Sequence, residues 1–374
     1  HMEFIPTTEH NRLYDWQPHI DRLGLSEKMA TVIGIELTGA GQHLNAFPLQ
    51  HHPLSQDGGA PRWQFDPRLN AIVLRNLFGE SHRKWVQINH PRVGEVFNDR
   101  DADGEADGGF FGFEDLIDAA ETWSTEILNL KPTYEVKTLL DSDVARGTSI
   151  VPPQLFRTSI TQNRTFGWLQ LLNQGRHMWC VAVSDAHRVF GRWAAGGWRT
   201  YVRSSTDEPG DIDPDEIIQN SRAGQMMITN GPFLEVWTAE GGPIGSRIVS
   251  PGSVALAIQV QTPNWLDIDR VQILVNGRQP IEYNFTRATD PTMFQKGVVQ
   301  FDEKVQVKLS EDAHLIVVAT GESSTLQKGW GRSPQGRMHP VAFTNPIYVD
   351  VDGNGFQANG DNLGYPLLVA MPTE

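Results

Sequence analysis

The chain has 374 residues, of which 39% are hydrophobic and 20% charged, a composition that supports a folded core and excludes global disorder. Its 31 lysine and arginine residues against 45 aspartate and glutamate residues leave a formal net charge of -14, so a nucleic-acid-binding protein is not expected. No apolar run approaches the ~18 residues that a membrane-spanning helix needs. The single cysteine, Cys180, excludes an internal disulfide and a zinc finger, so any metal ion must be bound by His, Asp and Glu.

The first 230 residues alternate between strand-like and helix-like segments. Short, almost uninterrupted apolar runs at residues 4–8, 30–38, 85–89 and 179–184 are typical of buried parallel strands. Helices are expected at residues 68–78, 113–120 and 166–173, and a fourth should begin at Asp213-Pro214 and end at Gly224. Strands that alternate with helices predict a parallel β/α domain over residues 1–230.

The pattern changes after residue 230. Runs at residues 233–238, 254–261, 270–275, 297–301, 305–309 and 314–319 are short, strand-like and separated by turns such as Asn276-Gly277. Regularly spaced short strands without helices predict an antiparallel β-sandwich, Ig-like in size, over residues 231–350. Residues 351–374 are expected to form a C-terminal loop or tail.

Histidine and carboxylate side chains gather at the ends of four predicted strands of the first domain. A single histidine at such a position is more often an ordinary hydrogen-bonded loop residue. Four strand ends with the same chemistry favour a metal centre, because the carboxyl ends of barrel strands converge on one face and imidazole with carboxylate suits zinc, manganese or iron. The predicted ligands are His10, Glu36, His43, His90, Asp185 and His187.

These segments resemble the motifs of a known enzyme superfamily. Thr8-Glu9-His10-Asn11 is similar to the second motif of the polymerase-and-histidinol-phosphatase (PHP) superfamily, and the segments around Glu36, His43, His90 and Asp185 resemble its later motifs in the same order. Gly231-Pro232-Phe233 and Thr344-Asn345-Pro346 resemble the CehA/McbA-type metallohydrolases. The resemblance implies a distorted, TIM-like β/α barrel with two or three metal ions that hydrolyses phosphoester, carbamate or other ester-like bonds.

The chain departs from this superfamily at two points. Glu9 stands where the superfamily usually has Asp, and the first motif, Asp-x-His-x-His, is absent. Because the chain begins at the second motif, we expect that the first barrel strand precedes this sequence in a longer protein. Sites that depend on the first motif should then be incomplete, while the ion held by Glu36, His43 and His90 should remain.

The chemistry that this resemblance implies is hydrolysis by a metal-activated water, in which Asp185 and His187 also have a catalytic role. Arg92 and Arg188, each adjacent to a predicted ligand, are candidates for binding an anionic small-molecule substrate, although a surface ion pair explains each of them equally well. The sequence contains no Gly-x-Ser-x-Gly motif for a serine nucleophile.

Two acidic loops begin like a calcium-binding loop. Residues 99–104 have the pattern Asp-x-Asp-x-Asp-Gly, and residues 350–355 have the related pattern Asp-x-Asp-x-Asn-Gly. Solvated acidic turns are the alternative interpretation, since neither loop is flanked by two clear helices and the first has Phe110 at its twelfth position. The candidate calcium ligands are Asp99, Asp101, Asp103 and Asp107 in the first loop and Asp350, Asp352, Asn354 and Asp361 in the second.

A metal-dependent hydrolase is thus the first functional hypothesis. The alternatives are a calcium-stabilised extracellular binding module, with glycans as one ligand class, and a catalytically degenerate scaffold of the same superfamily. The calcium-like loops and the single cysteine favour a location outside the cytoplasm without identifying the compartment. The substrate, the metal and the oligomeric state are not predicted.

Overall fold

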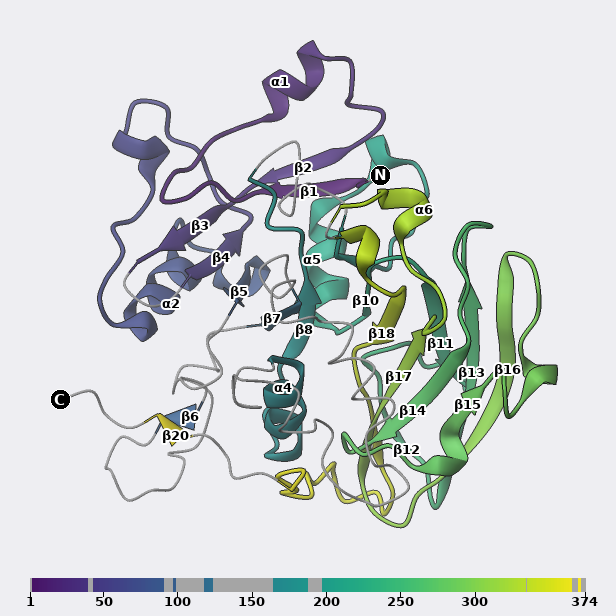
Figure 1. Cartoon of the computed structure of the whole chain (residues 1–374). Coiled ribbons are helices and arrows are strands. Elements are labelled where there is room, and N and C mark those ends of the chain that lie inside the picture. Colours follow the sequence, from purple (N-terminus) through teal and green to yellow (C-terminus); the bar gives the residue numbers. More distant parts are fainter. Residues whose placement is uncertain are drawn as a thin grey trace. The chain divides into compact units, whose positions relative to one another are not determined.

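The computed structural model describes residues 2–39, 43–90, 97–98, 118–123, 164–187, 197–333, 335–364 and 369–370 (Figure 1). The chain divides into two compact units, which are His1–Glu121 with Val202–Ala223 and Val369–Glu374, and Thr122–Tyr201 with Gly224–Leu368. The domain limits expected from the sequence stay a prediction. Among the described residues, no helix has both the length and the apolar character that crossing a membrane requires.

The first unit contains a mixed sheet and a separate parallel strand pair. Strands β1 (Phe4–Thr7) and β2 (Ala30–Ile33) pair in parallel. In the mixed sheet, β4 (His43–Phe47) runs antiparallel to both β3 (Ile35–Thr38) and β5 (Trp85–Asn89). Strand β7 (Ala119–Trp123) pairs in parallel with β5 through Ala119 and Ala120, and the short strands β6 (Phe97–Asn98) and β20 (Val369–Ala370) pair in parallel.

Three α-helices belong to the described part of this unit, α1 (Gln17–Arg22), α2 (Pro67–Asn76) and α5 (Pro214–Arg222), with 3-10 turns at Gln56–Gly59, Ser81–Arg83 and Pro209–Asp211. Asp66 caps α2 by accepting a hydrogen bond from the backbone N–H of Arg68 (2.8 Å), and Asp213 caps α5 through Asp215 (2.9 Å). Both helices therefore begin where an acidic cap followed by proline predicts.

The predicted β/α barrel is wrong. The described part of the chain holds only five α-helices and its sheets are mostly antiparallel, without the alternation of parallel strands and helices that a barrel requires. The expected strand 30–38 is interrupted at Gly34, where a Cβ would lie 2.9 Å from the carbonyl oxygen of Ala46. The helix expected at 113–120 is also wrong at Ala119 and Ala120, which belong to β7, while residues 113–117 lie outside the described part.

The second unit is built mainly from two sheets. One has eight strands. Six of them have the order β12 (Arg247–Val249), β19 (Ile347–Asp350), β17 (Ala313–Thr320), β18 (Val341–Thr344), β10 (Met226–Thr229) and β9 (Arg199–Val202). In addition, β14 (Arg270–Val275) pairs with β17, and β15 (Asn284–Thr286) pairs with β14. The other has the order β11 (Phe233–Thr238), β13 (Ser253–Gln261) and β16 (Val299–Lys308). The unit also contains β8 (Trp179–Ala182), α4 (Arg164–Asn173), α6 (Gln327–Trp330) and 3-10 turns at Ile281–Tyr283, Pro291–Met293 and Gln335–Arg337.

Strand β17 is buried on both of its faces and so lies between two hydrophobic clusters. Leu315 and Val317 pack in the cluster shared with Leu256 of β13, which joins the two sheets face to face. Ile316 and Val318 point the other way, into the cluster that contains Trp168 of α4. Alternation along one strand thus supplies both layers of the core.

His314, at the helix-facing side of β17, is a buried neutral imidazole. Its Nε2 lies 2.7 Å from Oδ1 of Asn173, whose Nδ2 donates to the carbonyls of Asn276 and Asp361, so the amide orientation makes Nε2 the donor. Nδ1 has no hydrogen-bond partner among the residues that the structure describes. Burial, with a smaller contribution from the charge of His177, lowers the pKa of His314 to about 3.

We predict that His314 makes the second unit sensitive to acid. Between pH 6.5 and the folded pKa of about 3, the unfolded chain protonates this side chain and the folded chain does not. The free energy of unfolding should therefore fall by about 1.4 kcal/mol per pH unit below pH 6.5 on account of this residue. In urea unfolding, the free energy of unfolding of the wild type should fall by about 2 kcal/mol more between pH 7 and pH 5 than that of His314→Gln. His82→Gln, in an exposed position, is the control, and an equal effect there would contradict the prediction.

Candidate metal centre

One face of the three strands β3, β4 and β5 is polar. Two rows of Cα partners cross these strands, Glu36–Asn45–Gln87 and Thr38–His43–Asn89. Because partners share a face and side chains alternate along a strand, both rows lie on the same side of the sheet. The residues between them are apolar and at most 1% exposed, and they are Ile35, Leu37, Leu44, Ala46, Val86 and Ile88. One face packs in the core while the other carries the candidate site.

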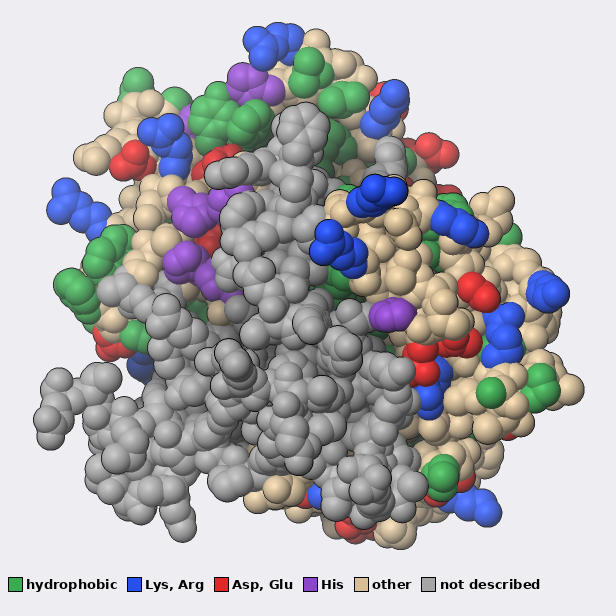
Figure 2. Space-filling view, viewed as in Figure 1, with side chains coloured by type: hydrophobic (Ala, Val, Ile, Leu, Met, Phe, Trp, Pro, Cys, Tyr) green, Lys and Arg blue, Asp and Glu red, His purple; other side chains and the backbone are tan. Residues whose placement is uncertain are grey.

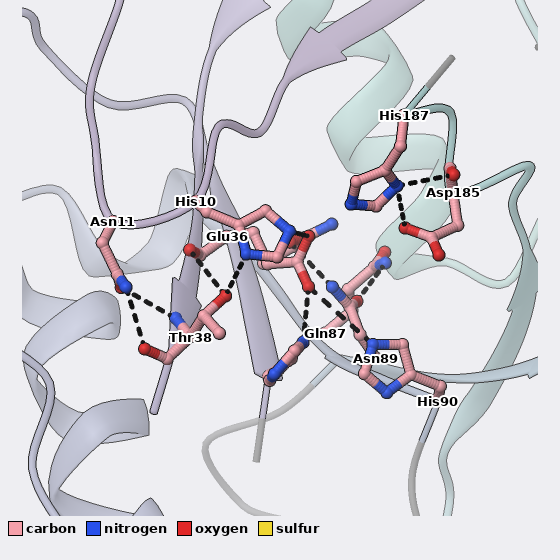
Figure 3. A network of polar contacts seen from close by, with 11 residues as sticks. His10, Asn11, Glu36, Thr38, Gln87, Asn89, His90, Asp185 and His187 are labelled. Carbon is pink, nitrogen blue, oxygen red and sulfur yellow. Dashed lines mark hydrogen bonds and ion pairs between the residues drawn. The ribbon is translucent and has the colours of Figure 1, made fainter. Parts of the chain in front are cut away.

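Glu36 is the centre of this face (Figure 3). Its side chain is 8% exposed. His43 Nδ1 lies 2.9 Å from Oε1, and His90 Nε2 lies 3.8 Å from the same oxygen. His10 Nε2 approaches the other oxygen, Oε2, at 3.4 Å. Three imidazoles therefore surround one buried carboxylate, and they divide between its two oxygens.

The environment keeps Glu36 ionised. Burial alone would raise the pKa of its carboxyl, because the charged form loses hydration. Contacts with His43 and His90, the charge of His10 and a hydrogen bond from Asn89 act in the opposite direction and prevail, so the pKa of Glu36 lies well below its ordinary value. At neutral pH the site therefore offers a fixed negative charge to a cation.

The segment that carries His10 is attached to β3 by side chains. Residue 10 forms an isolated parallel bridge with Glu36. The Asn11 amide donates to the Thr38 carbonyl (2.9 Å) and accepts from the Thr38 N–H (2.8 Å). Thr38 Oγ1 in turn lies 3.0 Å from His10 Nδ1, which leaves Nε2 facing Glu36. The adjacent His10 and Asn11 thus have a local structural reason, since Asn11 binds Thr38 and Thr38 orients the His10 imidazole.

Glu36, His43 and His90 form a group that could hold a metal ion, with one ligand atom from each residue within 4.8 Å of the others. Two imidazoles with one carboxylate form the His₂Glu set of catalytic zinc sites, in which the fourth position is left for water. The His43 and His90 side chains are 28% and 18% exposed, so solvent reaches the imidazole side of Glu36. Histidine side chains also gather on the face shown in Figure 2.

The other two predicted ligands belong to the second unit. His187 Nδ1 lies 3.2 Å from Oδ1 of Asp185 and 2.9 Å from its carbonyl oxygen. Asp185 has φ +46°, a left-handed conformation that is uncommon for a residue with a side chain. Their predicted part in metal binding and catalysis stays a prediction. Arg92 and Arg188 lie outside the described residues.

The second acidic loop brings together a different set from the one expected. Asp350 and Asp352 group with Asp312, with one oxygen from each within 4.8 Å of the others, and so form a second group that could hold a metal ion. Asn354 donates to the Asp352 carboxylate (2.6 Å). Asp361, the expected closing ligand, instead pairs with Arg278 at 2.6 Å. The first loop, with Asp99, Asp101, Asp103 and Asp107, lies outside the described residues.

Sequence reasoning missed Asn45, Gln87, Asn89 and Asp312. A usable signal was present for the first three, because residues 35–38, 43–46 and 86–89 alternate between apolar and polar side chains. That period marks strands with two different faces, and it also predicts that the polar residues lie on one side. Asp312 had no local signal, since β17 separates it in the chain from the acidic loop.

A scan of family models and searches of curated proteins and of solved structures find no match to this chain.

Proposed function

We propose that this protein is a metal-dependent hydrolase whose ion is held by Glu36, His43 and His90. The supporting observation is the buried Glu36 carboxylate with three imidazole nitrogens at 2.9 to 3.8 Å. An ionised carboxylate with imidazoles suits zinc, manganese or iron. The similarity of the surrounding segments to PHP-type motifs supports the same class of activity.

The residues of the chain have separate parts in this proposal. An ion bound by these residues would supply an activated water, and in the best-known zinc sites such a water has a pKa of about 7. Glu36 compensates the charge of the ion, and its Oε2 atom faces His10, which offers a further nitrogen on that side. The part-exposed imidazoles keep this side of the site accessible to solvent. Hydrolysis of a small ester or phosphoester by a metal-activated water requires no serine or cysteine nucleophile.

We infer in addition that the group Asp312, Asp350 and Asp352 binds calcium. Its ligand atoms are all carboxylate oxygens, which suit a hard cation. Asp350 is 8% exposed, and its two oxygens accept the backbone N–H groups of Gly353 (2.7 Å) and Gly355 (2.8 Å), so the loop holds this carboxylate in place. A calcium ion here would stabilise the second unit.

Both inferences are tested on the full chain purified without chelators. Elemental analysis should find zinc, manganese or iron, which a His43→Gln/His90→Gln variant should lose and Asp350→Asn should keep. Bound calcium should be lost in Asp350→Asn and kept in the His43→Gln/His90→Gln variant. p-Nitrophenyl phosphate, bis-p-nitrophenyl phosphate and p-nitrophenyl acetate serve as substrates with added zinc or manganese.

Hydrolysis of one substrate, abolished by the double histidine variant, is the expected result. Absence of bound transition metal, with no binding of added Zn²⁺ or Mn²⁺, would contradict the metal centre. Metal binding without hydrolysis of any substrate would contradict the hydrolase and favour the catalytically degenerate scaffold.

A further inference from the structure

Two buried amide side chains, Gln87 and Asn89, connect Trp85 to the Glu36 carboxylate. Trp85, Gln87 and Asn89 are alternate residues of β5 and share one face of the strand, where they are 2%, 5% and 5% exposed. The Trp85 indole N–H donates to Gln87 Oε1 (2.9 Å), and Gln87 Nε2 donates to Asn89 Oδ1 (2.9 Å). Asn89 donates to Asn45 Oδ1 (2.9 Å) and to the Glu36 carboxylate.

The order of donors along this row has a chemical origin. An indole can only donate, so Gln87 must turn its oxygen towards Trp85 and its amino group towards Asn89. Asn89 must then present its oxygen to Gln87 and its amino group to Glu36. A reversed Gln87 would place N–H against N–H at the indole and oxygen against oxygen at Asn89. Only one orientation of both amides therefore satisfies these buried groups, and leaving them unpaired would be costly.

We propose that Trp85, Gln87 and Asn89 are positioning residues that fix the metal-binding carboxylate of Glu36. The row directs an N–H group, never a carbonyl oxygen, at Glu36, and so holds its oxygens towards the imidazoles. Hydrogen bonds behind ligating carboxylates tune metal affinity in other proteins. The inference rests on the proposed metal centre. Of the three added residues, Asn89 contacts the metal-binding residue Glu36 directly, and Trp85 and Gln87 act through Asn89.

Gln87→Glu is the sharpest test, because it keeps the shape of the side chain and changes the donor into an acceptor. An ionised Glu at this position still accepts from Trp85 but cannot donate to Asn89, which should turn its amino group away from Glu36. In a competition titration of the full chain with a chromophoric chelator, Zn²⁺ affinity should fall about 10- to 100-fold. Far-UV circular dichroism of the metal-free protein checks folding.

Gln300→Glu is the matched control. Gln300 is equally buried at 5%, and its amide accepts from the Ile268 N–H (2.7 Å) and donates to the Leu266 carbonyl (3.1 Å) in the second unit. Its replacement imposes the same burial of a carboxylate without touching the row, so Zn²⁺ affinity should stay within about threefold of wild type. If Gln87→Glu fails to fold, Trp85→Phe replaces it. Phe removes the indole donor, and a threefold or greater loss of Zn²⁺ affinity is then required.

A second readout does not depend on metal. In metal-free protein labelled with ¹⁵N-asparagine, the Asn89 side-chain amide should be protected from hydrogen exchange, and Gln87→Glu or Trp85→Phe should shift its signals and reduce the protection. If the wild-type protein binds no Zn²⁺ but the two variants show these changes in the Asn89 amide, the proposed function is overturned while the hydrogen-bonded row itself is supported. If the Gln87→Glu and Trp85→Phe variants bind Zn²⁺ as tightly as the wild-type protein does, the positioning role is overturned.

Discussion

Glu36→Gln is expected to lower the affinity of the protein for Zn²⁺ by about 100-fold or more, which corresponds to about 2.7 kcal/mol. The substitution keeps the volume of the side chain and removes the only carboxylate of the group formed with His43 and His90. The neutral amide cannot compensate the charge of an ion, and its amino group would face the imidazole nitrogens. Isothermal titration of the full chain with Zn²⁺ measures the change.

The control for this variant is Glu80→Gln. Glu80 belongs to the same unit, its side chain is 64% exposed, and it pairs with Arg83 at 3.2 Å. The same change of charge at this position should leave Zn²⁺ affinity unaltered. A Glu36→Gln protein that binds Zn²⁺ within threefold of wild type would show that this carboxylate is not a ligand. Thermal unfolding with and without Zn²⁺ provides a second measurement, since an ion at 100 times its Kd stabilises the folded state by about 2.7 kcal/mol.

Asn345→Leu should destabilise the second unit by about 3 kcal/mol or more, because buried polar groups that lose their partners cost about 1 to 3 kcal/mol each. Asn345 is 0% exposed. Its Oδ1 accepts from the Cys180 N–H (2.8 Å), and its Nδ2 donates to the carbonyls of Cys180 (3.0 Å) and Met226 (3.3 Å). The side chain therefore joins β8 to β10 at a point where leucine offers no hydrogen bond.

Differential scanning calorimetry, in which the two units can unfold at different temperatures, measures this effect. Asn359→Leu is the matched control, since Asn359 is exposed and its side chain accepts a hydrogen bond from the Asp361 N–H (3.0 Å) in a local turn. It should cost less than about 1 kcal/mol. An Asn345→Leu protein that unfolds at the wild-type temperature would contradict the structural role given to this amide.

Local elements were largely predictable. Helix α2 begins at Pro67, one residue before the expected start, and ends at Asn76, two residues before the expected end. Strands β5, β11 and β14 have the bounds expected for residues 85–89, 233–238 and 270–275. The bounds of these elements are set by a capping residue or by an apolar pattern that involves only a few neighbouring residues, and both can be read directly from the sequence.

The chemistry of the candidate site was also predictable in kind. Twelve histidines and a single cysteine direct any metal to His, Asp and Glu, and the strand-end positions selected His10, Glu36, His43 and His90. The structure brings the three histidines together around the Glu36 carboxylate. Residue type and position along a strand determine which atoms are available, and both can be read from the sequence.

The direction of the strands, however, was decided only by the tertiary structure. Residues 30–38 read as one parallel strand, yet the chain breaks at Gly34 and returns through β4, so that His43 sits opposite Thr38 and Asn89. An apolar run records that a segment is buried but not which neighbour it pairs with, because pairing depends on residues distant in the chain. The same reason applies to the row from Trp85 to Glu36. Its members are visible in the sequence, but the orientation of each amide depends on a donor that only the folded sheet supplies.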